Sequence, residues 1–194
     1  GDELFAGYKR YRQHLRSAWR RHLPAWPKLR PAPAIVPGKR ERLALEASLG
    51  WLAAYPLRFS GIGLSERTAL QPDFSPRPHW WRIPENLAGR SPIEQLLAVD
   101  GENYLPEYIL RKADLLTMAH GLEARAPLLD HVFVGRVLAM PPAERFSDPV
   151  KQALAGVCPQ AGEFAFFERK KMGFNPPVHP LLQSLRPRLA GLPE

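Results

Sequence analysis

The sequence predicts a mainly α-helical chain that is divided into short elements, and three observations support this. Apolar residues recur at helical spacing, most regularly from Glu107 to His120. Ser91-Pro92-Ile93-Glu94 forms a capping box with proline at the first helical position, which is typical of a helix start. The 22 prolines among 194 residues interrupt regular elements, and the stretch from Leu57 to Gly89 contains no convincing strand.

The first half of the chain is expected to contain two helices before the capping box. The first begins at Gly1, with an apolar face formed by Leu4, Tyr8, Tyr11, Leu15 and Trp19. Five prolines between Pro24 and Pro37 then indicate a semi-rigid connector. A second helix is expected from about Lys39 to Tyr55, and Pro56 ends it.

The second half is organised around the stretch from Tyr104 to His131. Pro106 fits a helix start, and Gly121 fits the residue that stops this helix. Pro127 disfavours a helical Ala126, so Glu123 and Arg125 lie on a bend. The simplest interpretation of these two charges is an inter-helix ion pair that fixes a corner. The elements expected after the bend are a helix from His131 to Met140 capped by Asp130, a short helix with Lys151, an aromatic turn at Glu163–Phe167, a charged loop at Glu168–Phe174 and a final helix from Pro180.

Composition indicates a globular, cytoplasmic protein. The chain is 45% hydrophobic and 24% charged, which favours a folded core over disorder. A single cysteine, Cys158, excludes an internal disulfide framework and favours a reducing compartment. No secretory signal opens the chain, and its apolar stretches are too short to span a membrane.

A formal net charge of +8 permits an anionic partner, such as a nucleic acid or a phosphorylated small molecule. Arg12, Arg16 and Arg20 lie four residues apart and form a basic stripe with nearby Lys9, Arg10 and Arg21. A solvated helix face is the favoured interpretation, because no aromatic residue alternates with the arginines as single-strand binding requires. A basic helical nucleic-acid-binding module remains the alternative from a different functional class.

Most catalytic signatures are missing from the sequence. The six histidines are scattered, and the chain has no Walker A, GxSxG or GxGxxG motif. What remains is Asp2-Glu3, Lys151 and Lys170-Lys171. Acids that hold Mg²⁺ and lysines that neutralise phosphate oxygens are what a nucleotidyl or phosphoryl transfer site needs.

Three motifs make this assignment more specific, namely GDELFAGY at residues 1–8, LRKADLLTMAHGLEARAPLLDH at residues 110–131 and RKKMGFNPPV at residues 169–178. Together they closely resemble the C-terminal synthetase domain of the glutamine-hydrolysing asparagine synthetase family, in the family's order and across the whole chain. The resemblance implies that residues 1–194 are the helical C-terminal portion of an α/β ATP-pyrophosphatase domain.

The resemblance also implies roles for individual residues. Asp2 would belong to the Mg-ATP site, and Lys171 would contact the pyrophosphate and support the transition state. Lys151 would also reach the pyrophosphate. The bend with Glu123, Arg125, Pro127 and Asp130 would line or brace the cleft. The implied cofactors are therefore ATP and Mg²⁺.

The sequence departs from the family pattern in two ways. Ala6 replaces the usual first glycine after Phe5, a small change that we expect to be tolerated. The family's SGGxDS phosphate loop, the parallel sheet that bears it and the glutaminase domain do not occur in residues 1–194. We therefore expect a fragment that is inactive by itself, has exposed apolar helix faces and is poorly soluble.

The activity implied is amide formation from aspartate or a similar carboxylate. The carboxylate would react with ATP to give an acyl-adenylate and pyrophosphate, and ammonia from glutamine would then displace AMP. Neither a nucleic acid nor a membrane is expected as a partner, and a homodimer would form through the missing domains. The acceptor stays open, because a related amidotransferase of a polysaccharide or peptide tailoring pathway, or a β-lactam-synthetase-like cyclase, would share the fold. The intact EARAP motif disfavours the cyclase.

Overall fold

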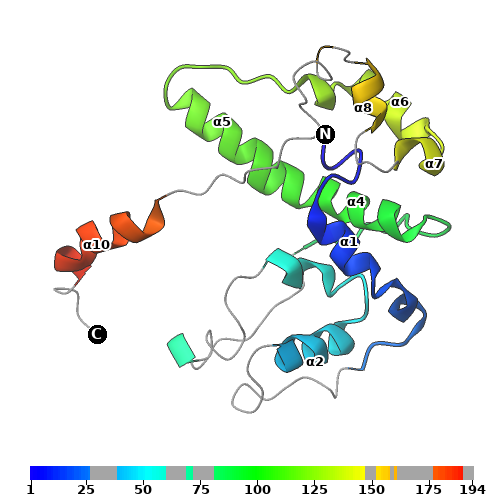
Figure 1. The fold of residues 1–194 in the computed structure, drawn as a ribbon, viewed down its shortest axis with the longest axis horizontal. Coiled ribbons are helices and arrows are strands. Elements are labelled where there is room, and N and C mark those ends of the chain that lie inside the picture. The colour runs from blue at the N-terminus through cyan, green and yellow to red at the C-terminus, as the bar shows by residue number, and fades with distance from the viewer. Residues whose placement is uncertain are drawn as a thin grey trace. The chain divides into compact units, whose positions relative to one another are not determined.

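A computed structural model describes residues 1–26, 39–59, 69–71, 81–146, 152–157, 160 and 177–189 (Figure 1). The chain divides into two compact units, residues 1–153 and residues 154–194. All regular elements in the described ranges are helical. This confirms the mainly α-helical prediction, whereas the α/β class implied by the family resemblance stays a prediction.

The first helix starts later than predicted. Residues 2–6 form a turn, α1 spans Lys9–Leu15, and the 3₁₀ helix η1 follows at Ala18–His22. Ala6 has a φ of +56° and lies in the left-handed region, where a right-handed helix cannot continue. The Gly7 N–H donates to the Asp2 carbonyl at 2.9 Å across this residue, which closes the turn as a helix C-cap would.

The second predicted helix is shorter than expected. The helix α2 spans Lys39–Leu49 and ends at Gly50, whose φ is +78°. A 3₁₀ helix, η3, then spans Tyr55–Phe59 with Pro56 in its first turn. The prediction that the helix would continue to Tyr55 was therefore wrong, because it assigned the stop to Pro56 and overlooked Gly50.

The capping box is confirmed. The carboxylate of Glu94 accepts hydrogen bonds from the Ser91 N–H at 2.9 Å and from the Ser91 hydroxyl at 2.6 Å, at the start of α4 (Pro92–Glu102). Both hydrogen bonds lower the pKa of Glu94, and the bond from the Ser91 hydroxyl has the larger effect. Residues 81–90 before it contain neither helix nor strand, as expected.

A helical segment starts around Pro106 as predicted. The helix α4 ends at Glu102, and its C-cap residue Asn103 has a non-helical φ of −125°. A π-helical segment, η5 (Leu105–Leu110), connects α4 to α5 (Arg111–Met118), and Figure 1 shows the two helices following one another. Pro106 lies in the first turn of η5, where its missing N–H costs no hydrogen bond within the helix. The sequence did not predict that this first turn would be π-helical.

The predicted stop and cap on either side of the bend are confirmed. Gly121 has a φ of +67°, and the Leu122 N–H donates to the Thr117 carbonyl at 3.0 Å, as in a Schellman motif. The Asp130 carboxylate accepts from the backbone N–H groups of Val132 and Phe133 at the start of α6. The remaining helices of the bend and the chain end are η6 (Pro127–Leu129), α6 (His131–Ala139), α7 (Pro142–Arg145), α8 (Gln152–Val157) and α10 (Val178–Leu189).

Two corrections apply to these later elements. The final helix begins at Val178, two residues before the predicted Pro180. The aromatic turn at Glu163–Phe167 and the loop at Glu168–Phe174 lie outside the described residues.

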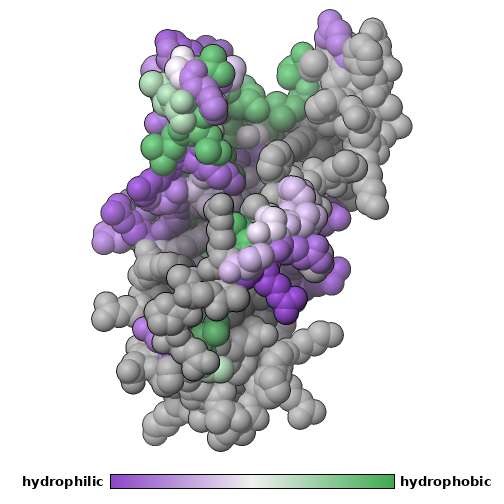
Figure 2. Space-filling model, turned by 90° about the vertical axis from the view of Figure 1, so that its left-hand side faces the viewer, coloured by the Kyte–Doolittle hydropathy of each residue, from purple (hydrophilic) through white to green (hydrophobic). Residues whose placement is uncertain are grey.

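The core of the first unit is small and rich in aromatic residues. It lies where α1 and η3 contact α4, and its buried members are Tyr11, Trp51, Tyr55, Leu96, Leu97 and Val99. The helix α5 differs, because its Leu115, Leu116 and Met118 are 56–62% exposed. Figure 2 shows green, hydrophobic surface beside purple, hydrophilic surface on one face of the molecule. Exposed apolar residues on this helix agree with the expectation from the sequence, whereas poor solubility stays a prediction.

Candidate functional site

The turn that carries Asp2 is anchored by its neighbours. Leu4 and Phe5 are buried, and Glu3 is only 8% exposed. The Tyr8 hydroxyl donates to Glu3 Oε1 at 2.6 Å, and the Leu4 carbonyl accepts from Arg145 Nε at 2.8 Å. Asp2, which the family resemblance places in the Mg-ATP site, therefore belongs to a turn that side chains hold from two directions.

The pKa of Tyr8 depends on burial and on the charges of this turn. Burial raises the pKa of the Tyr8 phenol well above its usual range, and the hydrogen bond to Glu3 and the charges of Glu3 and Asp2 raise it further. The phenol is therefore neutral and acts as a hydrogen-bond donor. It donates to the carboxylate of Glu3, the residue that follows Asp2.

A buried ion pair between α1 and α4 is connected to this turn through Tyr8. Arg10 of α1 donates to Asp100 Oδ2 of α4 at 2.6 Å, and the same oxygen accepts from the hydroxyls of Tyr11 and, at 3.1 Å, Tyr55. Asp100 is completely buried. Burial raises the pKa of its carboxyl, although Arg10 and both phenols favour the ionised form. The carboxylate stays ionised at neutral pH, because a buried guanidinium without an anion would be far more costly.

Aromatic rings surround the Arg10 guanidinium. Its central carbon lies 3.6 Å from the ring centroid of Tyr8 and 4.4 Å from those of Phe59 and Tyr104. Burial alone lowers the pKa of Arg10, yet the charge of Asp100 and the hydroxyl of Tyr55 raise it overall. The network thus connects α4, through Arg10 and the ring and hydroxyl of Tyr8, to the turn that carries Asp2.

The basic stripe predicted from the sequence is not one continuous surface. Arg12 and Arg16 are exposed, but Arg20 lies beyond the end of α1 and pairs with Glu46 at 3.3 Å. Arg10 points into the core. A sequence signal for this existed, because Asp100 follows Leu96 by four residues on the apolar face of α4 and a buried acid needs a cation.

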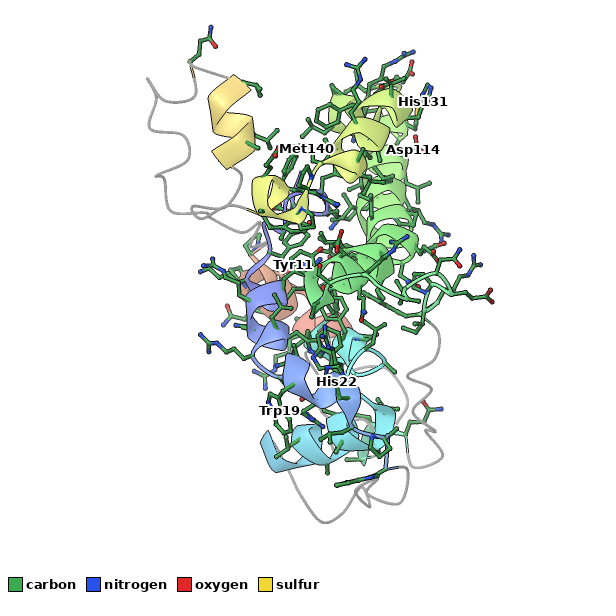
Figure 3. The ribbon with its side chains drawn as sticks, turned by 90° about the vertical axis from the view of Figure 1, so that its right-hand side faces the viewer. Tyr11, Trp19, His22, Asp114, His131 and Met140 are labelled. Atoms are coloured by element: carbon green, nitrogen blue, oxygen red, sulfur yellow. The ribbon has the colours of Figure 1, made fainter. Side chains whose placement is uncertain are left out.

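The bend between α5 and α6 forms the ion pair that the sequence predicted. Arg125 Nη2 lies 2.9 Å from Glu123 Oε1, and the side chains are 82% and 69% exposed. Figure 3 shows Asp114 of α5 and His131 of α6, on either side of this bend, away from Tyr11 of the core. An exposed pair contributes little to stability, so these charges are available to a ligand.

The two predicted lysines lie outside the described residues. Lys151 immediately precedes α8, and Lys171 belongs to the segment 161–176. No group of three metal-ligating side chains occurs among the described residues. Mg²⁺ is often held by one or two carboxylates together with substrate phosphates and water. Asp2 has the chemistry of one such carboxylate, and its role in a metal site stays a prediction.

In the part of the chain that the structure describes, no helix has the length and apolar character needed to cross a membrane.

Comparisons with known proteins agree with the motifs. The sequence matches the asparagine synthase family model over residues 1–192. It is 30% identical over 200 residues to proteins of Mycobacterium bovis and Mycobacterium tuberculosis strain H37Rv that are described as candidate asparagine synthetases (glutamine-hydrolyzing). It is 27% identical over 201 residues to "Asparagine synthetase (glutamine-hydrolyzing) 1" of Bacillus subtilis strain 168.

These matches cover 94% of this chain but only 29% of the mycobacterial proteins and 30% of the Bacillus protein. The chain thus spans less than a third of the length of these relatives. No solved structure matches the chain significantly.

Proposed function

Because the chain belongs to the asparagine synthase family, we propose that it is the C-terminal part of an ATP-dependent, amide-forming ligase of the glutamine-hydrolysing type. The observation that carries this proposal is the family match over residues 1–192. Two features of the described residues support it. The turn that bears Asp2 is held in place from two sides, and the Glu123–Arg125 pair is open to solvent.

The proposed reaction has two steps. A carboxylate oxygen of aspartate, or of a similar acid, attacks the α-phosphorus of ATP. The bond to the β-phosphate oxygen breaks, which gives an acyl-adenylate and pyrophosphate. The nitrogen of ammonia, supplied from glutamine, then attacks the acyl carbon. A carbon–nitrogen bond forms, and AMP leaves with the former carboxylate oxygen.

The chain's own residues would act mainly through charge. Lys151 and Lys171 would offset the negative charge that develops on the leaving pyrophosphate, because fixed cations stabilise a transition state without reorganisation. Asp2 would hold one side of a Mg²⁺ ion. The ion, when bound, would neutralise phosphate oxygens and orient the leaving group. Glu123 and Arg125 would line or brace the acceptor side of the cleft.

A product assay of the full-length gene product tests this proposal. With ATP, Mg²⁺, glutamine and aspartate, we expect AMP, pyrophosphate and asparagine in equal amounts. An amide that forms only with a different carboxylate would identify a related amidotransferase. If neither AMP nor an amide forms with any acceptor, the ligase assignment is wrong.

A lysine variant tests the proposed roles separately. In the same protein, Lys171→Ala should abolish amide formation and leave glutamine hydrolysis unchanged, because the pyrophosphate contact is not needed for hydrolysis. Normal amide synthesis by Lys171→Ala would remove Lys171 from the mechanism.

A further inference from the structure

The turn formed by residues 1–7 contains backbone strain. Ala6 has a φ of +56° and is the only non-glycine residue with a positive φ among those described. The hydrogen bond from Gly7 N–H to the Asp2 carbonyl, at 2.9 Å, spans Ala6 and depends on this conformation. A second hydrogen bond, from Phe5 N–H to the Gly1 carbonyl at 3.0 Å, closes the preceding part of the turn. Strained residues persist where the surrounding structure over-determines them. Contacts from outside the turn must therefore hold it.

One such contact comes from far along the chain. Arg145 of α7 is 4% exposed, and its Nε donates to the Leu4 carbonyl at 2.8 Å across 141 positions of sequence. Its guanidinium carbon lies 4.8 Å from the centroid of the Phe146 ring. Among the described residues, no carboxylate lies within ion-pairing distance of Arg145. Burial lowers the pKa of this group, and the charge of Glu94, which lies beyond ion-pairing distance, offsets part of this decrease. A cation has therefore been desolvated without a direct anionic partner.

The second contact comes from the buried network. Glu3 accepts from Tyr8 at 2.6 Å, and the Tyr8 ring lies on the Arg10 guanidinium that Asp100 holds. Two residues close to Asp2 are thus held by other elements. Leu4 is held by Arg145 of α7, and Glu3 is held by Tyr8, whose ring contacts Arg10 of α1. The hydrogen bond from Arg145 is separate from the bonds between Arg10, Asp100 and the tyrosine hydroxyls, so it can be removed without breaking the core network.

We propose that Arg145 is a positioning residue that holds the turn of residues 1–7 so that the Asp2 carboxylate faces the metal–nucleotide complex. This inference rests on the proposed function, because it takes Asp2 as a metal ligand. Arg145 does not touch the substrate itself. It acts through the Leu4 carbonyl, two residues from Asp2.

Three variants of the full-length gene product separate positioning from general stability. Arg145→Met keeps the length and apolar stem of the side chain but removes its donor. Arg145→Lys restores a cationic donor that can reach the carbonyl. Arg20→Met is the matched control, because Arg20 is a partly buried arginine whose side chain contacts Glu46 at 3.3 Å, outside the turn.

The first measurement is amide hydrogen exchange, which needs no ligand. In Arg145→Met, we expect residues 1–8 to exchange at least about 10-fold faster while α4 keeps its protection, because local opening is separable from global unfolding. Arg145→Lys should restore most of the protection, and Arg20→Met should leave residues 1–8 unchanged. Unchanged exchange of residues 1–8 in Arg145→Met, or an equal loss of protection in α4, would overturn the proposal.

The second measurement is the affinity for ATP with Mn²⁺, a spectroscopic substitute for Mg²⁺, followed by electron paramagnetic resonance. Asp2→Asn and Arg145→Met should each weaken binding by about 10-fold, as loss of a ligand or of its support does in metal sites. If Asp2→Asn weakens binding and Arg145→Met does not, the positioning role is wrong. If Asp2→Asn has no effect, the metal role proposed for Asp2 fails instead, and hydrogen exchange still decides whether Arg145 holds the turn.

Discussion

The two arginine–carboxylate pairs of this chain have the same chemistry and opposite environments. Arg10 and Asp100 meet at 2.6 Å, where the Asp100 side chain is fully buried. Arg125 and Glu123 meet at 2.9 Å with most of both side chains in water. The buried pair connects α1 to α4 and holds the aromatic core together. The exposed pair lies on a bend where solvent and ligands can reach it, so burial separates a structural pair from a candidate binding pair.

The largest effect should follow from breaking the buried pair. Asp100→Asn leaves the Arg10 cation buried without an anion, and loss of one member of such a pair costs about 3–5 kcal/mol. Urea denaturation of the variant should show this decrease in the free energy of unfolding. A loss below about 1 kcal/mol would mean that water or another anion replaces Asp100.

The second-largest effect should come from alkaline pH, which lowers the stability contributed by the tyrosines around Asp100. Burial, followed by the charge of Asp100, raises the pKa of Tyr11 and Tyr55 above their unfolded value of about 10. Their contribution to stability is complete below that pH and is lost as pH rises, because only the unfolded chain then releases the protons. The loss should be about 3 kcal/mol per pH unit for the two tyrosines together. Tyrosinate absorbance near 295 nm should rise together with unfolding, and a rise in the folded protein would contradict the buried network.

A smaller effect on stability is expected from a substitution in the turn of residues 1–7. Ala6→Gly should stabilise the protein by about 0.5–1 kcal/mol, because release of left-handed strain exceeds the entropy that glycine adds to the unfolded chain. Thermal denaturation measures this change. Gly135→Ala in the middle of α6 is a control for the reverse substitution. The added Cβ would meet no atom within 4 Å, and alanine should stabilise the helix because its helix propensity is higher than that of glycine. Destabilisation by Ala6→Gly would show that the left-handed conformation is absent.

The smallest effect on stability should come from the exposed pair. Arg125→Gln should change the free energy of unfolding by less than about 1 kcal/mol, because water replaces the lost contact. The same variant of the full-length protein should raise the KM for the acceptor carboxylate if the bend lines the cleft. An unchanged KM, with unchanged stability, would make this pair a simple surface contact.

Local signals in the sequence predicted several elements well. Three residues each specify a helix end through local backbone geometry alone. They are Glu94, three residues after Ser91; Gly121, after one stretch of helical periodicity; and Asp130, before the next such stretch. The structure confirms all three. The motif around Asp2 likewise indicated the family, and the family comparison confirmed it.

The features that the sequence did not predict depend on distant or exceptional contacts. Arg10 looked like a member of a basic stripe, because its partner Asp100 lies 90 positions away. The turn of residues 1–7 looked helical, because alanine rarely adopts a positive φ and tertiary contacts enforce it here. The helix start at Pro106 was predicted but its π-helical geometry was not, because a π-helical turn has no simple sequence pattern.

A pair of double-mutant cycles tests the contrast between the two ion pairs most directly. The free energy of unfolding would be measured for Arg10→Met, Asp100→Asn and their combination, and for Arg125→Gln, Glu123→Gln and their combination. We expect a coupling energy of about 2–3 kcal/mol for the buried pair and less than about 0.5 kcal/mol for the exposed pair. Equal coupling energies would contradict the assignment of a structural role to one pair and a binding role to the other.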